Sequence, residues 1–323
     1  MKIVVLDGYA VNPGDLSWDK IKELGELEIY DRTPKDKILE RSRDADILLT
    51  NKTPIKRKTI EALTDLKYIG ILATGYNVVD IEAAAENEVI VTNAPDYSTN
   101  AVAQFTLALL LEAAVHVGEH NRAVKEKEWS KSEDFCFWNY PLIELQKKTL
   151  GIIGFGSIGQ RTAELALAFG MKVITYDRSP TKKIEDPNIE TDAIEFVNLN
   201  QLYTQADVIS LHCPLTEETA GLINQQSISQ MKDDVIIVNT ARGGLIVEED
   251  LAAALKSGKI QTAVLDVLTS EPPAASNLLL NSDNTIITPH IAWATKESRQ
   301  CLMDIVHGNI KAYIEGNIIN QVN

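Results

Sequence analysis

The sequence predicts an α/β protein built from two doubly wound parallel-sheet domains with a cleft between them. Short apolar runs alternate with amphipathic stretches along nearly the whole chain, which is the pattern of parallel strands joined by crossover helices. The alternation runs once through the first hundred residues and starts again near Thr149. A length of 323 residues allows two domains, and no repeat of solenoid length argues for another architecture.

The elements of the first half follow from this pattern. Helices are predicted at 34–43, where a proline suits the first turn, and at 80–88. One long, well-packed helix is expected over 101–127, with Asn100 as its N-cap. The aromatic-rich segment 129–141 follows no regular period, so an interface, a lid and ordinary loop packing all stay open. The predicted strands are 2–6, 27–30, 46–50, 68–72 and 89–93.

The second half repeats the alternation. A helix over 157–170 ends at a glycine, as does the last helix, over 296–316. Glycine is the residue type that most often follows a helix C-cap. The predicted strands are 149–155, 172–177, 207–213, 235–240, 262–267 and 285–288.

The charge of the chain excludes one class of function. Its 31 basic and 46 acidic residues give a net charge of −15, and no Lys–Arg cluster offers the basic face that nucleic acid phosphates need. A small anionic substrate would also be repelled at long range, so a site for one must hold a local cation.

Several features predict a cytoplasmic protein without a membrane span. The most apolar stretch, 101–115, is interrupted by polar residues and is therefore expected to be a buried helix. The N-terminus enters a strand without a cleavable signal pattern. Cys136, Cys213 and Cys301 are widely spaced and form no CxxC pair, which fits a reducing compartment.

The segment "LGIIGFGSIGQ" places Gly154, Gly156 and Gly159 in the G-x-G-x-x-G spacing, after a predicted strand and at the start of a predicted helix. The first glycine permits a tight turn, the second lets a pyrophosphate approach the backbone, and the third allows close packing of helix on strand. The helix N-terminus offers N–H groups to phosphates. This context predicts a Rossmann cofactor domain.

An acidic residue stands where such a domain recognises the adenosine ribose. Asp177 ends the next predicted strand, and its carboxylate would accept hydrogen bonds from the ribose hydroxyls. The same carboxylate disfavours the 2′-phosphate of NADP. Arg178 follows at once and could turn towards that phosphate, so NAD is predicted and NADP stays open.

Three ionisable residues lie just beyond three successive strands. Arg242 occurs in "NTARGG", Glu271 in "LTSEPP" and His290 in "TPHIAW". Ligands of open parallel sheets bind at the carboxyl ends of the strands, so these side chains are expected to converge near the cofactor. Each on its own could be a surface loop residue.

The three residue types suit the reduction of a 2-keto acid. The guanidinium of Arg242 would bind the substrate carboxylate in a bidentate pair, which supplies the required local cation. His290 would donate the proton to the carbonyl oxygen, since the ordinary pKa of an imidazole is about 6.5. Glu271 would hold the imidazole in place and stabilise its protonated form.

At this point the chain resembles a known family, the NAD-dependent D-isomer-specific 2-hydroxyacid dehydrogenases. The matching segments are "GIIGFGSIG", "NTARGGLIVEEDLAAAL", "AVLDV…SEPP", "TPHIAW", "LATGYNVVD" and "VTNAPDYSTNAVAQ". They occur in the family's order and cover essentially the whole chain. Within the family, "FCFWNYPLIELQKKTLGIIGFGSIG" and "HIAWAT" look most like members that interconvert D-glycerate and hydroxypyruvate; glyoxylate and pyruvate differ from hydroxypyruvate by few atoms and stay open.

The resemblance implies a domain division and further site residues. It implies a discontinuous, flavodoxin-like substrate domain of 1–99 plus 295–323, a cofactor domain of 100–294, and a homodimer joined through the latter. It assigns the roles above to Arg242, Glu271 and His290, with Asp266 facing the nicotinamide amide. Substrate-gripping residues would be Ala73, Thr74 and Gly75, and cofactor-lining residues would include Ser157, Ile158, Pro214, Thr240, Ala241 and Asp266.

Other interpretations fit the residues less well. His116 and His120 flank Glu119, but an HExxH metal site needs the acid directly after the first histidine, so no metal is predicted. His212 and Cys213 are expected to pack or line the cofactor and not to form a nucleophilic pair. A non-catalytic NAD-sensing corepressor would use the same fold, but the chain has little beyond the two domains.

Overall fold

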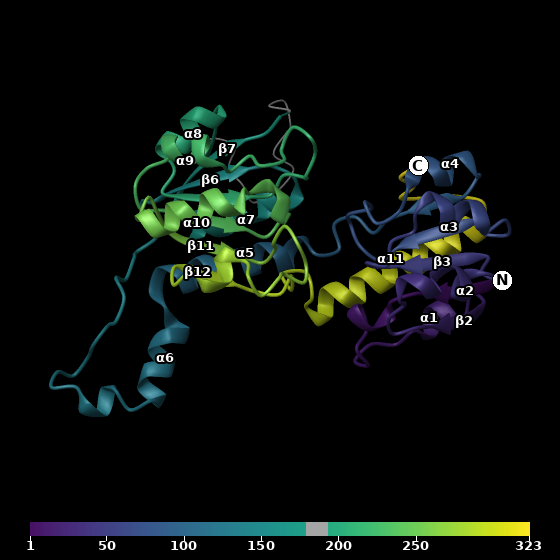
Figure 1. Ribbon diagram of the computed structural model, residues 1–323, viewed down its shortest axis with the longest axis horizontal. Helices are drawn as coiled ribbons and strands as arrows, with labels where there is room; N and C mark the ends of the chain where they lie inside the picture. Colours follow the sequence, from purple (N-terminus) through teal and green to yellow (C-terminus); the bar gives the residue numbers. More distant parts are fainter. Residues whose placement is uncertain (179–192) are drawn as a thin grey trace. The chain divides into compact units, whose positions relative to one another are not determined.

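The computed structural model describes residues 1–178 and 193–323. These residues form two compact units, each with its own parallel sheet. Unit 1 comprises Met1–Ser98 together with Trp293–Asn323, and unit 2 comprises Thr99–Ala292. The α/β class predicted from the alternating pattern is confirmed, with two wholly parallel sheets (Figure 1).

Unit 1 contains five strands in the order β2-β1-β3-β4-β5. Strands β3 and β4 are buried at every position, which explains their continuous apolar runs, because parallel sheets are covered on both faces. The strands are β1 (Lys2–Val5), β2 (Glu26–Ile29), β3 (Ile47–Thr50), β4 (Tyr68–Ile71) and β5 (Ile90–Thr92). The helices are α1 (Asp19–Lys22), α2 (Ile38–Ser42), α3 (Arg57–Ala62), α4 (Ile81–Glu86) and α11 (Lys296–Ile314).

The last helix, α11, returns to the sheet formed by the first hundred residues and packs near β4 (Figure 1). Leu302, Val306 and Ile310 are buried in one core cluster with residues of β1, β3 and β4. Near the start of the helix, both terminal nitrogens of Arg299 donate to the carboxylate of Asp15 at 2.7 Å. The discontinuous unit is thus held by apolar burial and by one bidentate ion pair.

Unit 2 contains seven strands in the order β12-β11-β10-β9-β6-β7-β8. The chain enters at β6 and extends first to β7 and β8, then returns to β9 on the other side of β6. This reversal is the position where open α/β sheets bind ligands. The strands are β6 (Thr149–Ile153), β7 (Lys172–Tyr176), β8 (Ile194–Phe196), β9 (Val208–Leu211), β10 (Val235–Asn239), β11 (Ile260–Leu265) and β12 (Thr285–Ile287).

Helices cover the sheet of unit 2 on both faces, with a separate buried apolar cluster on each. The helices are α5 (Thr99–Val115), α6 (Val117–Lys125), α7 (Ser157–Ala168), α8 (Leu199–Gln205), α9 (Gln225–Gln230) and α10 (Glu248–Ser257). Among the described residues, β8 is a strand that the sequence pattern did not indicate. It has only three residues and two of them are exposed, so it offers little apolar signal.

The single helix expected over 101–127 is wrong, because the chain breaks at His116. His116 adopts a left-handed conformation with φ of 50°, and α5 and α6 meet at an angle of 57°. The carboxylate of Glu112 accepts a hydrogen bond from the backbone N–H of Gly118 at 3.0 Å and so serves the first turn of the second helix. Asn100 lies inside α5 and is not its N-cap.

The first of these two helices, α5, is largely buried, as predicted for the apolar stretch. No single helix within 1–178 and 193–323 is long and apolar enough to cross a membrane, although the bent pair α5–α6 meets that test by length and composition alone.

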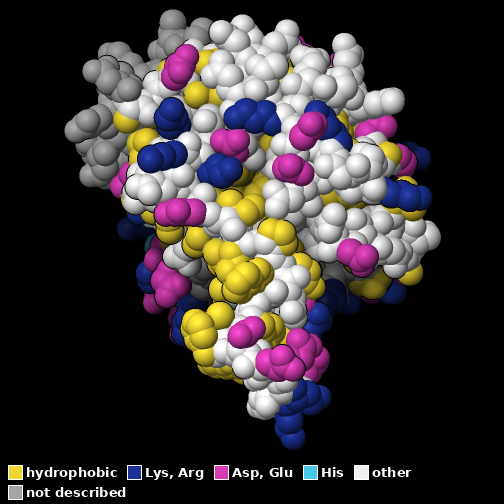
Figure 2. Space-filling view, turned by 90° about the vertical axis from the view of Figure 1, so that its left-hand side faces the viewer, with side chains coloured by type: hydrophobic (Ala, Val, Ile, Leu, Met, Phe, Trp, Pro, Cys, Tyr) yellow, Lys and Arg dark blue, Asp and Glu magenta, His cyan; other side chains and the backbone are white. Residues whose placement is uncertain are grey.

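Residues 117–142, here called the arm, leave the sheet of unit 2 as α6 and an irregular segment (Figure 1). His116 stacks on Tyr140 with ring centroids 4.7 Å apart, and Ile143 donates a backbone hydrogen bond to Ala114. The arm exposes many large apolar side chains, and Figure 2 shows apolar side chains gathered on this side of the molecule. They are Val117, Val124, Trp129, Phe135, Trp138, Tyr140 and Leu142.

Candidate active site

The glycine loop lies between β6 and α7, where the sequence placed it. Gly154 has φ of +96°, and a Cβ added there would lie 2.5 Å from the backbone nitrogen of Cys213. A Cβ on Gly159 would lie 2.3 Å from the carbonyl oxygen of Gly154. Both positions therefore require glycine for conformation or close approach. Gly156 is the N-cap of α7, so Ser157 and Ile158 form the helix N-terminus, a position suited to a phosphate.

A cavity of about 330 Å³ opens beside this loop. The carboxylate of Asp177 reaches back from the end of β7 and accepts a hydrogen bond from the backbone N–H of Phe155 at 2.8 Å. Of the predicted cofactor residues, the cavity brings together Gly154, Gly156, Asp177 and Pro214. Its position beside the β6–β9 reversal and its acidic end suit the adenosine half of a dinucleotide.

The remaining predicted cofactor residues, Thr240, Ala241 and Asp266, lie at the ends of the next two strands, β10 and β11. The hydroxyl of Thr240 is 2.9 Å from that of Thr106 on α5. The backbone N–H of Ala241 donates to the side chain of Asn239 at 3.0 Å. They do not line the 330 Å³ cavity, and their strand-end positions suit the nicotinamide half.

The structure brings His290 and Glu271 into direct contact. The Nδ1 atom of His290 lies 2.6 Å from Oε2 of Glu271, and Oε1 of the same carboxylate accepts a hydrogen bond from the backbone N–H of Leu268 at 3.1 Å. The carboxylate thus fixes the imidazole through Nδ1, an arrangement suited to proton transfer at Nε2.

Arg242 follows β10, the neighbour of β11 in the sheet. One terminal nitrogen of its guanidinium donates to the carbonyl of Ala241 at 2.7 Å, and its own carbonyl accepts from the side chain of Asn239 at 2.9 Å. Arg242, Glu271 and His290 therefore follow three adjacent strands, β10, β11 and β12, at one edge of the sheet.

The carboxylate of Asp266 holds the loop that carries His290. Asp266 is 1% exposed and accepts hydrogen bonds from the hydroxyl of Thr288 at 2.6 Å, the N–H of Ile291 at 2.9 Å and the N–H of Ala292 at 2.8 Å. Burial raises the pKa of this carboxyl. The sequence marked Asp266 only for the nicotinamide, because these bonds join residues more than twenty positions apart.

His212 and Cys213 do not form an activated pair. The imidazole of His212 is 2.8 Å from the hydroxyl of Ser210, and burial lowers the pKa of His212 to about 4. Burial raises the pKa of the Cys213 thiol to about 11. Both side chains are therefore neutral near pH 7, and a thiolate nucleophile is not available here. Both residues line the 330 Å³ cavity beside the glycine loop.

The predicted substrate-gripping residues Ala73, Thr74 and Gly75 follow β4 in unit 1. The hydroxyl of Thr74 donates to the carbonyl of Ala94 at 2.9 Å, and its own carbonyl accepts from the side chain of Asn93 at 2.7 Å. These bonds anchor the turn to the residues that follow β5.

A second loop at this sheet edge is organised by Asp7, which the sequence did not single out. Its carboxylate accepts hydrogen bonds from the backbone N–H groups of Asn51 at 2.8 Å, Lys52 at 2.6 Å and Thr53 at 2.7 Å. The side chain of Asn51 then donates to the carbonyl of Leu72. The loops after β1, β3 and β4 are thereby tied together.

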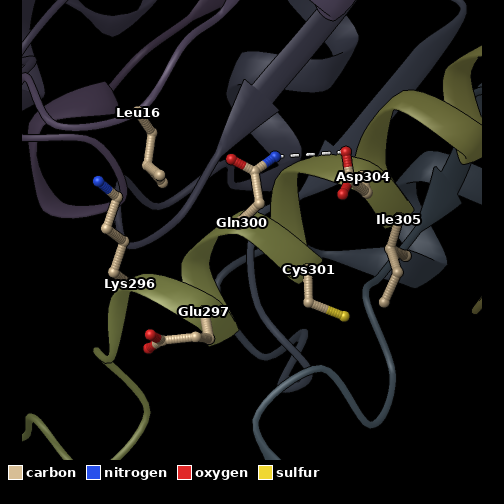
Figure 3. A pocket seen from close by; sticks show the side chains of 7 residues that line it. All are labelled: Leu16, Lys296, Glu297, Gln300, Cys301, Asp304 and Ile305. Atoms are coloured by element: carbon tan, nitrogen blue, oxygen red, sulfur yellow. Dashed lines mark hydrogen bonds between the residues drawn. The ribbon is translucent and has the colours of Figure 1, made fainter.

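A separate depression lies on the surface of unit 1. The depression of about 730 Å³ beside α11 is open and is lined by Leu16, Lys296, Glu297, Gln300, Cys301, Asp304 and Ile305 (Figure 3). It gathers surface side chains, with a 3.3 Å hydrogen bond from Gln300 to Asp304. Within 1–178 and 193–323, no group of three or more His, Cys, Asp or Glu side chains is arranged to hold a metal ion.

A glycine loop at the strand reversal, an acid at the adenosine end and a histidine–carboxylate pair define a dinucleotide-dependent oxidoreductase. Residues 107–292 match the family model described as the NAD binding domain of D-isomer specific 2-hydroxyacid dehydrogenases. The chain belongs to the D-isomer specific 2-hydroxyacid dehydrogenase family, whose members act on a CH–OH group, and the predicted resemblance is confirmed.

Three relatives illustrate the range of the similarity. Hydroxypyruvate reductase of Blautia hydrogenotrophica is 51% identical over 326 residues and covers all of both chains. Glycerate dehydrogenase of Methylorubrum extorquens is 38% identical over 99% of this chain and 98% of its own. The structure of an acyclic imino acid reductase in complex with NADPH and D-Arg is 31% identical, covers both chains fully and has a TM-score of 0.87.

Proposed function

We propose that this enzyme reduces hydroxypyruvate to D-glycerate with NADH and also accepts glyoxylate. The names of the two similar relatives, hydroxypyruvate reductase and glycerate dehydrogenase, support this substrate pair. The single observation that carries the catalytic assignment is the 2.6 Å contact between His290 and Glu271. It gives an imidazole that can donate a proton and a carboxylate that orients it.

Each catalytic side chain has one task in this proposal. NADH held by the glycine loop would supply the hydride for the carbonyl carbon of the substrate. His290 donates the proton from Nε2 to the carbonyl oxygen as the alkoxide develops. Glu271 accepts the hydrogen bond from Nδ1 and stabilises the imidazolium before the transfer. Arg242 binds the substrate carboxylate through its guanidinium fork, which offsets the repulsion from a net charge of −15.

We assign substrate recognition also to unit 1, and cofactor binding to unit 2. The turn formed by Ala73, Thr74 and Gly75 would bind the substrate carboxylate through backbone N–H groups, supported by its anchoring to Ala94 and Asn93. Asp7 would act as a positioning residue for the neighbouring loop. Gly154, Gly156, Ser157, Ile158 and Gly159 would bind the pyrophosphate, and Pro214, Thr240, Ala241 and Asp266 the rest of the cofactor.

We propose that NAD is preferred over NADP. The carboxylate of Asp177 lines the dinucleotide cavity and is fixed by the N–H of Phe155. In this position it can accept hydrogen bonds from ribose hydroxyls and repel a 2′-phosphate. The fold alone does not determine the choice between NAD and NADP, since the imino acid reductase with the same fold is in complex with NADPH.

We further propose a homodimer in which the arm covers a second copy of the chain. The support is the apolar surface of the arm, where Phe135 is 89% exposed and Trp138 63% exposed. Side chains of this size rarely gather on a monomer surface unless they make an interface. The variants Phe135→Ser and Trp138→Ser should shift sedimentation from dimer to monomer, whereas Leu280→Ser, on an exposed apolar residue outside the arm, should not. A wild-type monomer at micromolar concentration would remove this proposal.

The substrate is tested by the rate of NADH oxidation with hydroxypyruvate, glyoxylate, pyruvate and phosphohydroxypyruvate. The proposal expects kcat/KM to be highest for hydroxypyruvate and next for glyoxylate. A preference for pyruvate would instead indicate a lactate-forming enzyme. No turnover of any of the four, in protein that binds NADH, would leave the catalytic assignment without support. The cytoplasmic location predicted from the cysteine pattern stays a prediction.

A further inference from the structure

The adenosine end of the cavity contains an ion pair that the predicted site did not include. The guanidinium of Arg178 lies 2.9 Å from the carboxylate of Glu218, and both residues line the cavity together with Asp177. Arg178 follows β7, and Glu218 comes from the turn after β9, so the pair joins the two sides of the cavity mouth. Forty positions separate the two residues in the sequence.

The turn that carries Glu218 is fixed by its own hydrogen bonds. The hydroxyl of Thr219 donates to the carbonyl of Pro214 at 2.7 Å and accepts from the N–H of Thr216 at 2.8 Å. The N–H of Ala220 donates to the carbonyl of Thr216 at 2.9 Å. The backbone of Glu218 is therefore held between anchored neighbours, and its carboxylate is presented to Arg178 by a defined turn.

The charges at this mouth oppose a phosphate even though a cation is present. Asp177 and Glu218 contribute two negative charges and Arg178 contributes one positive charge, so the three side chains carry a net charge of −1. The guanidinium already has a carboxylate partner in Glu218. A 2′-phosphate would have to displace that partner and would meet two carboxylates in the process.

We propose that Glu218 determines cofactor choice by engaging Arg178 in an ion pair. Among the residues that the structure describes, Arg178 is the only cation at the end of β7 that the 2′-phosphate of NADP could use, and the ion pair withholds it. The inference rests on the proposed function in so far as the cavity binds the adenosine half of the cofactor. It assigns the preference for NAD to two carboxylates, Asp177 and Glu218, and gives Arg178 a latent role as a phosphate ligand.

The size of the effect follows from Coulomb's law in water, because both side chains are more than two-thirds exposed. A phosphate with nearly two negative charges, roughly 6 Å from one carboxylate, is disfavoured about tenfold at low salt. Removal of the Glu218 charge should relieve this repulsion, and the freed guanidinium should add a favourable contact. Screening should reduce the difference at high salt, since the screening length for exposed charges falls from about 10 Å at 0.1 M to about 3 Å at 1 M.

The test compares Glu218→Gln with Glu217→Gln, which removes the same charge from the adjacent residue. The quantities are the dissociation constants of NADPH and NADH, measured by fluorescence without substrate, and kcat/KM for each cofactor with hydroxypyruvate. Glu218→Gln should raise the preference for NADPH relative to NADH by about tenfold at low salt. Glu217→Gln should change it by less than about threefold. Adding Arg178→Ala to Glu218→Gln should cancel the gain.

The inference is overturned if the cofactor ratio of Glu218→Gln equals that of wild type or of Glu217→Gln, or if the gain survives Arg178→Ala. The binding measurement needs no turnover. A protein that binds both cofactors but does not reduce hydroxypyruvate would therefore contradict the proposed substrate and still test the role of Glu218.

Discussion

The substitution Asp266→Asn tests how the catalytic histidine is held in place. The carboxylate of Asp266 accepts three hydrogen bonds from the segment around His290, at 2.6, 2.8 and 2.9 Å. All three partners are donors, two of them backbone N–H groups and one a hydroxyl. A carboxamide keeps one acceptor oxygen and turns an NH₂ group towards a donor, so at least one N–H in this buried place loses its partner.

The expected loss has two opposing parts. A hydrogen bond to a charged group contributes about 1.5–3 kcal/mol, and an unsatisfied buried N–H costs about 1–3 kcal/mol. Against this, the neutral amide avoids the cost of burying a charge, which is the reason the pKa of Asp266 is raised. A net destabilisation of about 2 kcal/mol is expected. A displacement of His290 by about 1 Å would lower kcat by about 100-fold.

The matched control is Thr285→Val, which removes a hydroxyl from β12, the strand that ends just before Thr288. The hydroxyl of Thr285 bonds to the carbonyls of Leu279 and Ser282. Thr285→Val should lower stability to urea without a comparable loss of kcat, whereas Asp266→Asn should lower both. If Asp266→Asn unfolds at the wild-type urea concentration and keeps more than half of the wild-type kcat, the proposed positioning role is refuted.

Three further predictions use other parts of the site. Arg242→Lys should lower kcat/KM for the keto acid by about 10- to 100-fold, because a point charge cannot replace the bidentate fork. The affinity for NADH is the control, and an unchanged kcat/KM would reject Arg242 as the carboxylate anchor. Asp7→Asn should raise KM for the keto acid by about tenfold, because the geometry of the 51–53 loop is lost. KM for NADH should stay within about twofold. The opposite pattern would count against the assignment of substrate recognition to unit 1. The pKa of His212 is about 4 in the folded protein and about 6.5 in the unfolded chain. Between these two pH values the unfolded state binds more protons, so the free energy of unfolding should fall by up to about 3 kcal/mol as the pH drops from 6.5 to 4. Urea titrations should show a smaller fall for His212→Gln, and an identical pH dependence in both proteins would contradict the buried neutral histidine.

The features that the sequence predicted correctly are local ones. The glycine loop depends on spacing within six residues, and each buried strand shows as a short apolar run. Glu271 and His290 could be predicted as a pair only because parallel strands end at one edge of a sheet. The break at His116 escaped prediction because both sides of it have helical composition, and the carboxylate of Glu112 that serves the second helix lies on the first.

The residues that the sequence missed act through contacts distant in the chain. Asp7 binds a loop more than forty positions away, and the partner of Arg178 is forty positions further on. Neither carboxylate stands in a motif whose spacing indicates a partner. The hydrogen bonds from the His290 loop to Asp266 also join residues distant in the chain. Asp266 matched a motif, but these hydrogen bonds depend on how β11 and β12 pair.

The role of His290 is tested by NADH oxidation at saturating hydroxypyruvate by wild type, His290→Gln and the control His307→Gln. NADH affinity is measured on the same samples by fluorescence. His290→Gln should lose at least about 100-fold in kcat while its affinity for NADH stays within about twofold, and His307→Gln should behave as wild type. A His290→Gln enzyme that retains more than a tenth of the wild-type kcat would contradict the assignment of His290 as the proton donor.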